Sequence, residues 1–302
     1  MSVAPRSMAA LTARRFARHR MAVASALVLV ALALSALAAP LVEVWLGIDA
    51  NEVDLLARFE GRSAAHPLGA DELGRDVLVR LLYGGRVSLF VALATALAAA
   101  VIGTVIGLVA GYYGRWADAV LMRVTDGVIA LPILPLLIIL AAVDMSKIPL
   151  VAALAETENA SLYRIVLIIT LVGWTTVARL VRGTALSLRE REYVVAARGM
   201  GASGFRIMAT HILPNTVSPI IVATTLSVGN VILFESVLSF LGLGIQPPIA
   251  SWGNMLNNAQ ELIYEAPALA FYPGALIFLT VIAFNFLGDG LQDALDPKAV
   301  HG

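Results

Sequence analysis

Few side chains in this sequence have the type and spacing that catalysis requires. The two lysines, Lys147 and Lys298, both stand outside a GxxxxGK motif, so no P-loop is present to bind the phosphates of a nucleotide. The histidines are scattered without an HExxH pair and cysteine is absent, which argues against a metal centre and excludes thiol chemistry. We therefore expect a chain that is not an enzyme and that binds no metal or cofactor itself.

Ionisable residues inside the apolar stretches are also few. Arg123 and Asp126 are three residues apart, so on a helix they can form a structural ion pair on one face. Glu235 lies late in another apolar run and is interpreted either as a pathway or gate contact or as an acid at the level of the lipid headgroups. A secondary transporter driven by an ion gradient normally places more ionisable groups near the membrane midplane, so it is the less favoured alternative.

A polar segment, EYVVAARGMGASGFRIMATHILPN, interrupts these stretches at residues 192–215. Helix-forming residues up to Met200 precede Gly201, and Ser203 is suited to cap a second short helix that ends where Pro214 begins the next span. In that second helix Phe205, Met208 and Ile212 recur at helical spacing. The resulting apolar face requires a cover, and composition alone leaves open whether lipid headgroups or another protein provide it.

Long apolar elements must position these residues. Hydrophobic residues make up 59% of the 302 residues and charged residues only 14%, with a mean hydropathy of +0.85, which is typical of an integral membrane protein. The formal net charge of zero gives no indication of a nucleic-acid partner. We predict an all-α polytopic fold, with a cytoplasmic segment 1–20 and one transmembrane domain 21–302. Its six spans are expected at 21–44, 87–111, 117–143, 165–181, 217–241 and 269–290.

Basic residues predict the orientation of these spans. Arginines cluster before the first span, between the second and third spans, and in the loop 182–216, so both termini and this loop are expected in the cytoplasm. The first apolar run is long enough to cross a bilayer and is interpreted as an anchor. The alternative is a cleaved signal peptide, because small residues precede Pro40.

Several local patterns predict how the spans pack and bend. Gly103, Gly107 and Gly111 recur every fourth residue, a spacing that lets helix backbones approach closely in lipid. Pro132 and Pro135 interrupt the third span and predict a kink or local unwinding.

Two external loops are expected to be folded, and a third is an insertion. Asp71 is suited to cap an amphipathic helix that enters the second span. Glycines and adjacent prolines in 239–256 predict an elbow in which Trp252 serves as an interfacial anchor. The stretch 144–163 is interpreted as an external polar insertion.

The polar segment also resembles a known motif. Ala196, Ala197 and Gly201, followed by ILPN at 212–215, resemble the cytoplasmic EAA loop of ABC-importer permeases, which docks into a cleft of the ATP-binding subunit. Further stretches resemble the C-type permease of dipeptide, oligopeptide and nickel importers, among them HPLGADELGRDVLVRLLYGGRVSL, SFLGLGIQPPIASWGNML and FNFLGDGLQDALDP. The sequence departs from the motif at Val195, where the family usually has Glu, and at His211.

The resemblance implies an ABC type I importer permease in a bacterial plasma (inner) membrane. It assigns ATPase docking to Glu192, Ala196, Ala197, Gly201, Ser203, Phe205, Met208, Ile212, Leu213 and Pro214. The residue patterns make Pro132, Pro135, Glu235 and Trp252 the candidates for a pathway or gate. The implied partners are a second homologous permease, two ATPase subunits that bind ATP and Mg²⁺, an extracytoplasmic binding protein, and membrane lipid. The implied substrates are di- or oligopeptides, with nickel or another small solute as the alternative.

Overall fold

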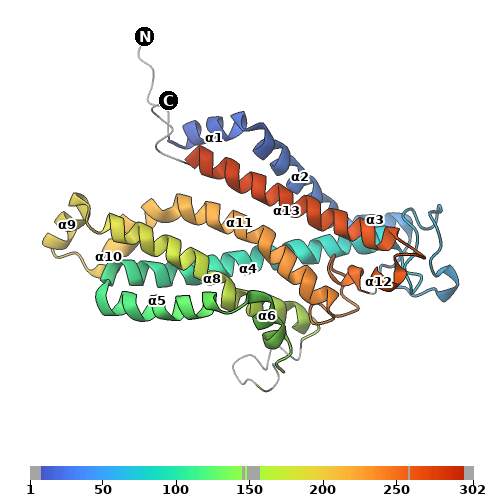
Figure 1. Ribbon diagram of the computed structural model, residues 1–302. Helices are drawn as coiled ribbons and strands as arrows, with labels where there is room; N and C mark the ends of the chain where they lie inside the picture. Colours follow the sequence, from blue (N-terminus) through green and yellow to red (C-terminus); the bar gives the residue numbers. More distant parts are fainter. Residues whose placement is uncertain (1–7, 145–146, 148–156, 258, 296–302) are drawn as a thin grey trace, which may run out of the picture.

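The structure is a computed structural model that describes residues 8–144, 147, 157–257 and 259–295. Within these residues the chain forms helices and turns, without a β-strand. The long helices run roughly along one axis (Figure 1). Their bounds are α1 Met8–Arg18, α2 Arg20–Leu37, α3 Ala39–Leu46, α4 Val77–Tyr113, α5 Arg115–Ala130, α6 Ile133–Ala141, α8 Ala160–Leu188, α9 Glu192–Gly199, α10 Gly204–Ile207, α11 Leu213–Phe240, α12 Ala259–Leu262 and α13 Ala268–Leu295.

Five helices in the described ranges are long and apolar enough to cross a membrane: α2, α4, α8, the continuous helix Gly204–Phe240, and α13. The bent pair of α5 and α6 makes a sixth if it is counted as one span, in agreement with the six predicted apolar runs. Helices α4, α8 and α13 extend past those runs, whereas α2 ends at Leu37, before the end of the predicted span 21–44. The 37-residue helix α4 begins ten residues before the predicted span.

The pair of α4 and α8 forms the most closely packed part of the bundle. A Cβ atom added to Gly103 would lie 2.5 Å from the carbonyl oxygen of Trp174, and one added to Gly107 would lie 2.6 Å from that of Ala178. At Gly111 the added atom would lie 2.5 Å from the side chain of Ala185. The predicted function of these glycines in close helix packing is therefore confirmed.

The third span is broken, as its prolines predict. Helix α5 ends at Ala130 and α6 begins at Ile133, with a 90° bend between them. Pro132 immediately precedes α6, and Pro135 lies in its first turn, where the missing N–H is tolerated. Because Pro135 has no N–H, the carbonyl of Leu131 lacks the donor that a continuous helix would supply four residues later. The bend leaves this carbonyl at the junction.

Two predicted helix boundaries are wrong. Asp76, and not Asp71, caps α4 by accepting a hydrogen bond from the Val79 amide at 2.8 Å. Gly74 has a φ of +74°, which turns the chain before a helix can begin, and Asp71 instead accepts from the amides of Leu73 and Arg75 within that turn.

The second boundary concerns the polar segment. The expected short helix after Ser203 is not separate, because α10 continues through a π-helical turn, Met208–Ile212, directly into α11. The fifth span and the predicted docking helix therefore form one continuous helix, Gly204–Phe240. Of the predicted insertion, residues 145–146 and 148–156 lie outside the described residues.

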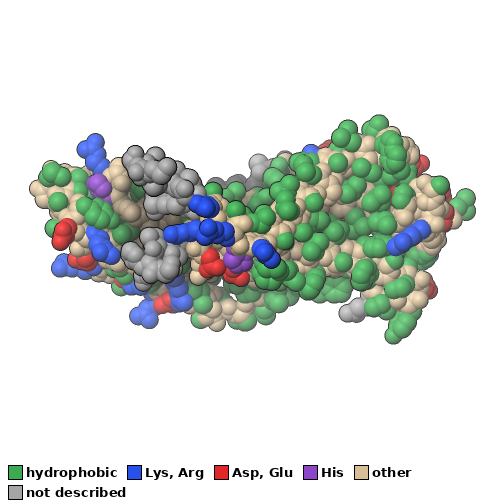
Figure 2. All heavy atoms as spheres, turned by 90° about the horizontal axis from the view of Figure 1, so that it is seen from above, with side chains coloured by type: hydrophobic (Ala, Val, Ile, Leu, Met, Phe, Trp, Pro, Cys, Tyr) green, Lys and Arg blue, Asp and Glu red, His purple; other side chains and the backbone are tan. Residues whose placement is uncertain are grey.

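The ends of the chain and the surface fit a membrane protein. Helix α1 lies beside α13 (Figure 1), so the two ends of the described chain are close together, as an even number of spans requires. Large apolar side chains such as Leu34, Leu97 and Phe278 are mostly exposed. Figure 2 shows hydrophobic side chains over most of the right half of one face, with charged side chains mainly on the left. The helices therefore present an apolar surface to lipid.

Candidate docking and transport site

The segment between α8 and α11, which we call the tip (residues 189–212), is packed firmly onto the transmembrane helices. Val194 and Ala197 of α9 and Ile207 and Ile212 after the break are all buried. They belong to one hydrophobic cluster with residues of α4 and α8, including Val181 and Ala185. Any displacement of the tip is therefore transmitted to α4 and α8.

Contacts with the end of α4 fix the orientation of the tip. The guanidinium of Arg198 lies 5.4 Å from the ring centroid of Tyr112, within the range of a cation–π interaction. A Cβ added to Gly204 would lie 2.9 Å from the same ring, so the start of α10 sits directly against Tyr112. Together these contacts tie both halves of the tip to α4.

The predicted break in the tip is present. Gly201 has a φ of +83°, a conformation that residues with a side chain rarely adopt. Ser203 caps α10, and its hydroxyl accepts a hydrogen bond from the Arg206 amide at 3.4 Å. The glycine break and the serine cap thus follow from local signals in the sequence.

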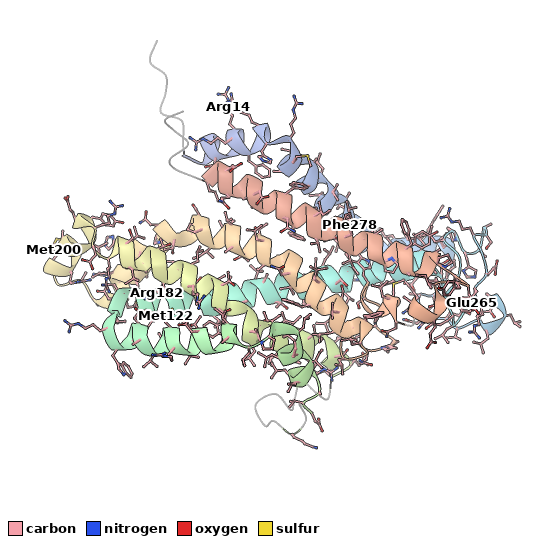
Figure 3. All side chains as sticks on the ribbon, viewed as in Figure 1. Arg14, Met122, Arg182, Met200, Glu265 and Phe278 are labelled. Carbon is pink, nitrogen blue, oxygen red and sulfur yellow. The ribbon has the colours of Figure 1, made fainter. Side chains whose placement is uncertain are left out.

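The outer face of the tip carries large apolar side chains without a cover from the described residues. The exposed fraction is 83% for Met200 and 78% for Phe205, and Figure 3 shows Met200 at the extreme end of the molecule. Tyr193 and Val195 are about half exposed. Of the predicted docking residues, Glu192, Ala196 and Pro214 also lie at the surface.

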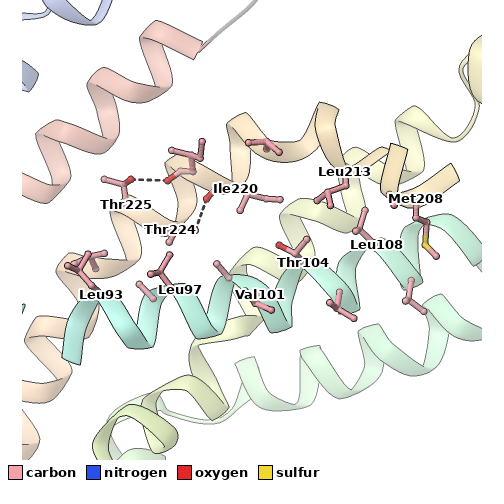
Figure 4. Close-up of a pocket in the computed structure, with 18 of the residues that line it drawn as sticks. Leu93, Leu97, Val101, Thr104, Leu108, Met208, Leu213, Ile220, Thr224 and Thr225 are labelled. Carbon is pink, nitrogen blue, oxygen red and sulfur yellow. Dashed lines mark hydrogen bonds between the residues drawn. The ribbon is translucent and has the colours of Figure 1, made fainter. Parts of the chain in front are cut away.

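The predicted common face is confirmed for Phe205 and Met208 and is wrong for Ile212. Phe205 and Met208 both line an apolar groove of about 810 Å³ between α4 and α11, whereas Ile212 is fully buried. The π-helical turn Met208–Ile212 changes the regular helical spacing between these residues. Figure 4 shows Met208 and Leu213 in this groove.

The groove has few polar groups that could form hydrogen bonds with a polar solute. The hydroxyls of Thr224 and Thr225 face it but donate to the carbonyls of Ile220 and Ile221 in their own helix, drawn as dashed lines in Figure 4. Thr104 of α4 also lines the groove, and the remaining lining residues are apolar. The groove is therefore suited to apolar contacts.

At the opposite end, the connection between α11 and α12, which we call the elbow (residues 241–257), folds onto a buried polar network. Glu235 is fully buried and accepts hydrogen bonds from Ser239 at 2.8 Å and Ser88 at 3.3 Å. Ser88 in turn accepts from the amide of Trp252 at 3.1 Å. The Glu235 side chain is not exposed to lipid headgroups, because the elbow covers it.

Trp252 is likewise not an interfacial anchor. Its side chain is 2% exposed, and its indole N–H donates to the carbonyl of Leu81 at 2.9 Å. Gly84 and Gly85 provide the space for the ring, since an added Cβ at either would lie within 3.2 Å of it. Trp252 also lines a cavity of about 300 Å³ together with residues of α2, α4 and α13, among them Leu32, Gly85 and Tyr272. Glu235 and Trp252 both connect the elbow to the spans.

The predicted ion pair between Arg123 and Asp126 is not formed. Asp126 pairs with Arg179 of α8 at 2.5 Å, and Asp118 of α5 pairs with Arg182 of α8. The second pair has two contacts, one of them between Arg182 Nη2 and Asp118 Oδ2 at 2.6 Å. Sequence spacing within one helix could not reveal these pairs, because their members lie more than 50 residues apart.

The fold and the tip together define a class of protein: a polytopic membrane protein with exposed apolar side chains at the end of its helical bundle. Comparison with known proteins then gives the family. A family model described as the binding-protein-dependent transport system inner membrane component matches residues 103–301. A second, described as the N-terminal TM domain of oligopeptide transport permease C, matches residues 7–49. The chain belongs to this family of inner-membrane permeases.

Several relatives are similar along nearly the whole chain. A glutathione transport system permease protein of Pectobacterium atrosepticum is 41% identical, covering 94% of this chain and 89% of its own. A dipeptide transport system permease protein of Alkalihalophilus pseudofirmus is 38% identical, with 94% and 88% covered. An oligopeptide transport system permease protein of Bacillus subtilis is 36% identical, with 94% and 88% covered. The match at residues 7–49 supports the interpretation of the first span as a membrane anchor.

Proposed function

We propose that this chain is a permease subunit of an ATP-driven importer and forms half of the pathway for peptides. A second, homologous permease forms the other half, and an extracytoplasmic binding protein delivers the peptide. Two ATPase subunits bind and hydrolyse ATP with Mg²⁺ on the cytoplasmic side. This chain itself performs no catalysis.

The observation that carries the proposal is the contrast between the two faces of the tip. The inner face is buried against α4 and α8, whereas Met200 and Phe205 on the outer face are exposed. Contiguous apolar side chains on a surface of this kind mark a protein interface. An ATPase cleft that receives this face would cover it.

The packing of the tip against α4 and α8, and its continuity with α11, suggest how ATP binding drives transport. The tip is one body with the cytoplasmic ends of α4 and α8, and α10 continues without a break into α11. When the ATPase subunits close, the tip moves with them and the rigid spans rock between inward-open and outward-open states. ATP binding thus shifts the equilibrium between the inward-open and outward-open states through the docked tip.

Peptide substrates are proposed from the relatives. Their names specify dipeptide, oligopeptide and glutathione transport, and all three substrates are short peptides. A small polar substrate of this class needs a binding protein to collect it and a pathway to cross the membrane.

Purification of the tagged chain from its native membrane in mild detergent tests the docking proposal. We expect the wild-type chain to retain an ATPase and a second permease. The double variant Met200→Asp with Phe205→Asp should retain the second permease and lose the ATPase, because charge disfavours burial in the cleft. Tyr264→Asp, also at a highly exposed side chain but at the elbow end, is the matched control and should retain both. Wild-type chain without any ATPase would contradict the proposal.

Uptake by the reconstituted importer tests the substrate. Proteoliposomes that contain the complex and its binding protein should accumulate a labelled dipeptide when ATP is supplied. Excess unlabelled dipeptide should compete, and Ni²⁺ should not. Accumulation of ⁶³Ni²⁺ without dipeptide uptake would replace the peptide assignment with metal import.

A further inference from the structure

Two ion pairs join α5 to α8, and they differ in exposure. The side chains of the Asp118 and Arg182 pair are 19% and 34% exposed, whereas those of Asp126 and Arg179 are 56% and 50% exposed. The first pair has two hydrogen bonds between side chains. The second has one, from Arg179 Nη2 to Asp126 Oδ1, among the described residues. Arg179 and Asp126 therefore retain hydrogen-bonding capacity for another molecule.

The exposed pair lies inside the predicted apolar runs. Asp126 is nine residues inside the run 117–143 and one turn before α5 ends at the break, and Arg179 is two residues before the end of the run 165–181. Charged side chains within a span almost always face a protein interior or water rather than lipid. This side of α5 and α8 is therefore expected to face the aqueous pathway.

A cavity of about 490 Å³ opens beside the pair, at the bend between α5 and α6. Its volume is in the range of roughly 300–1,000 Å³ that is common for small-ligand sites. Arg179 and Thr176, which are three residues apart on α8, line it together with Leu131. The cavity lining thus includes a cation and a hydroxyl.

We propose that Arg179 and Asp126, with this cavity, form a binding site for the charged ends of a peptide in the pathway. The peptide carboxylate binds the guanidinium of Arg179, whose planar donors fit carboxylates. The peptide ammonium binds the carboxylate of Asp126, which lies beside the cavity through its contact with the lining residue Arg179. When no peptide is present, the two side chains neutralise each other, so neither is left as an isolated charge within the membrane.

The site deepens the proposed function and rests on it, because it specifies a zwitterionic substrate. A divalent cation alone has no use for a guanidinium, and hard or borderline metals prefer oxygen, nitrogen or sulfur ligands that carry no positive charge. An uncharged solute would leave both charges without new partners. The composition of the site therefore favours a substrate with both a free ammonium and a free carboxylate.

The test uses the purified importer with its accompanying subunits in proteoliposomes. Uptake is measured for labelled Ala-Ala and for the same dipeptide with an amidated carboxyl end, and the readout is the ratio of the two rates. The wild-type importer should favour free Ala-Ala by about tenfold or more, the worth of a charge-assisted hydrogen bond. Arg179→Gln should reduce this ratio to about 1. Co-purification of the subunits verifies that the variant has folded.

Two further variants separate binding from structure. Arg182→Gln removes the neighbouring ion pair, which does not line the cavity, and should keep the wild-type ratio. The double exchange Asp126→Arg with Arg179→Asp restores an ion pair but reverses the two charges, so it should not restore the ratio.

Two results would overturn the site while leaving the proposed function intact: an unchanged ratio in Arg179→Gln, or a wild-type ratio in the double exchange. The second would show that the pair only joins α5 to α8. A wild-type importer that assembles with its ATPase but takes up no dipeptide would overturn the peptide assignment itself, and this site with it.

Discussion

The elbow and the tip are both short connections between long apolar helices. A large aromatic side chain is buried in the elbow, whereas large apolar side chains are exposed in the tip. In the elbow, Trp252 is 2% exposed and donates to a backbone carbonyl of α4. In the tip, Met200 and Phe205 are about four-fifths exposed. Since burial of such side chains stabilises a fold by roughly 1.5–3 kcal/mol each, the exposed side chains of the tip do not contribute this stabilisation to the isolated chain.

The difference separates two functions of a connection. The elbow is completed by the chain's own groups: Asn254 donates to the carbonyl of Ile249 at 2.7 Å, and its side-chain oxygen accepts from the Ser251 amide at 2.9 Å. Arg164 of α8 also donates to the carbonyl of Leu243 at 3.1 Å. The elbow is therefore closed by the chain itself, whereas under the proposed function the tip is covered by the ATPase subunit. Substitutions in the elbow should reduce stability, and substitutions in the tip should reduce association.

The largest effect is expected for Trp252→Ala in the elbow. Truncation of a buried aromatic side chain typically destabilises a protein by about 3–5 kcal/mol, because it leaves a cavity. The loss also leaves the carbonyl of Leu81 without its donor. Thermal unfolding of the purified chain in detergent should show a clearly lower midpoint. Trp45→Ala, at a side chain that is 82% exposed, is the matched control and should change the midpoint little.

The next largest effect should appear in binding rather than stability. Phe205→Ala is expected to weaken the affinity for the ATPase subunit by about tenfold to a hundredfold, the range of an aromatic anchor at an interface. The free energy of unfolding of the isolated chain should change by only about 0.5 kcal/mol, since the side chain contacts solvent there. Parallel titration and unfolding measurements check this. A large loss of stability with unchanged affinity would show that Phe205 stabilises the fold and does not contribute to binding of the ATPase subunit.

An added side chain should have different effects on stability at Gly201 and at Gly199 of the tip. Gly201→Ala should destabilise the tip by about 1 kcal/mol, because φ is +83° there and a side chain is strained in that conformation. Gly199 lies two residues earlier without a positive φ, and an added Cβ would likewise meet nothing within 4 Å. Gly199→Ala is therefore the control and should be neutral or slightly stabilising. Hydrogen exchange of the α9 amides measures both.

A bulkier variant extends this test to docking. Because the space beside Gly201 is empty in the isolated chain, Gly201→Trp should still insert into the membrane but should not transport, since the indole would obstruct the ATPase cleft. Normal uptake by this variant would contradict the assignment of the tip as the docking surface.

The sequence predicts the features that depend on local signals. The glycines at 103, 107 and 111 pack α4 against α8, Pro132 lies at the bend, and Ser203 caps α10. It does not predict contacts that depend on distant segments. The burial of Trp252 requires Gly84 and Gly85 of α4, and the partner of Asp126 lies on another helix. An amphipathic side chain such as Trp suits an interface and a core equally well, so only the tertiary structure decides.

The smallest effect concerns Glu72, in the external loop before α4. Burial and, to a lesser extent, the neighbouring Asp71 raise the pKa of the Glu72 carboxyl above its ordinary value of 4.5. The folded state therefore holds this proton more tightly than the unfolded state does, and ionisation of Glu72 destabilises the fold as the pH rises through the raised pKa.

Glu72→Gln removes this penalty, because the amide does not ionise. At neutral pH the variant should unfold at a slightly higher temperature than the wild type. The advantage should shrink as the pH falls through the raised pKa and should disappear below about 4.5, where the carboxyl is protonated in both states. Unfolding midpoints measured between pH 4 and pH 8 check the sign. If the variant still unfolds at a higher temperature than the wild type at pH 4, the difference in midpoint comes from packing. In that case ionisation of Glu72 does not destabilise the fold.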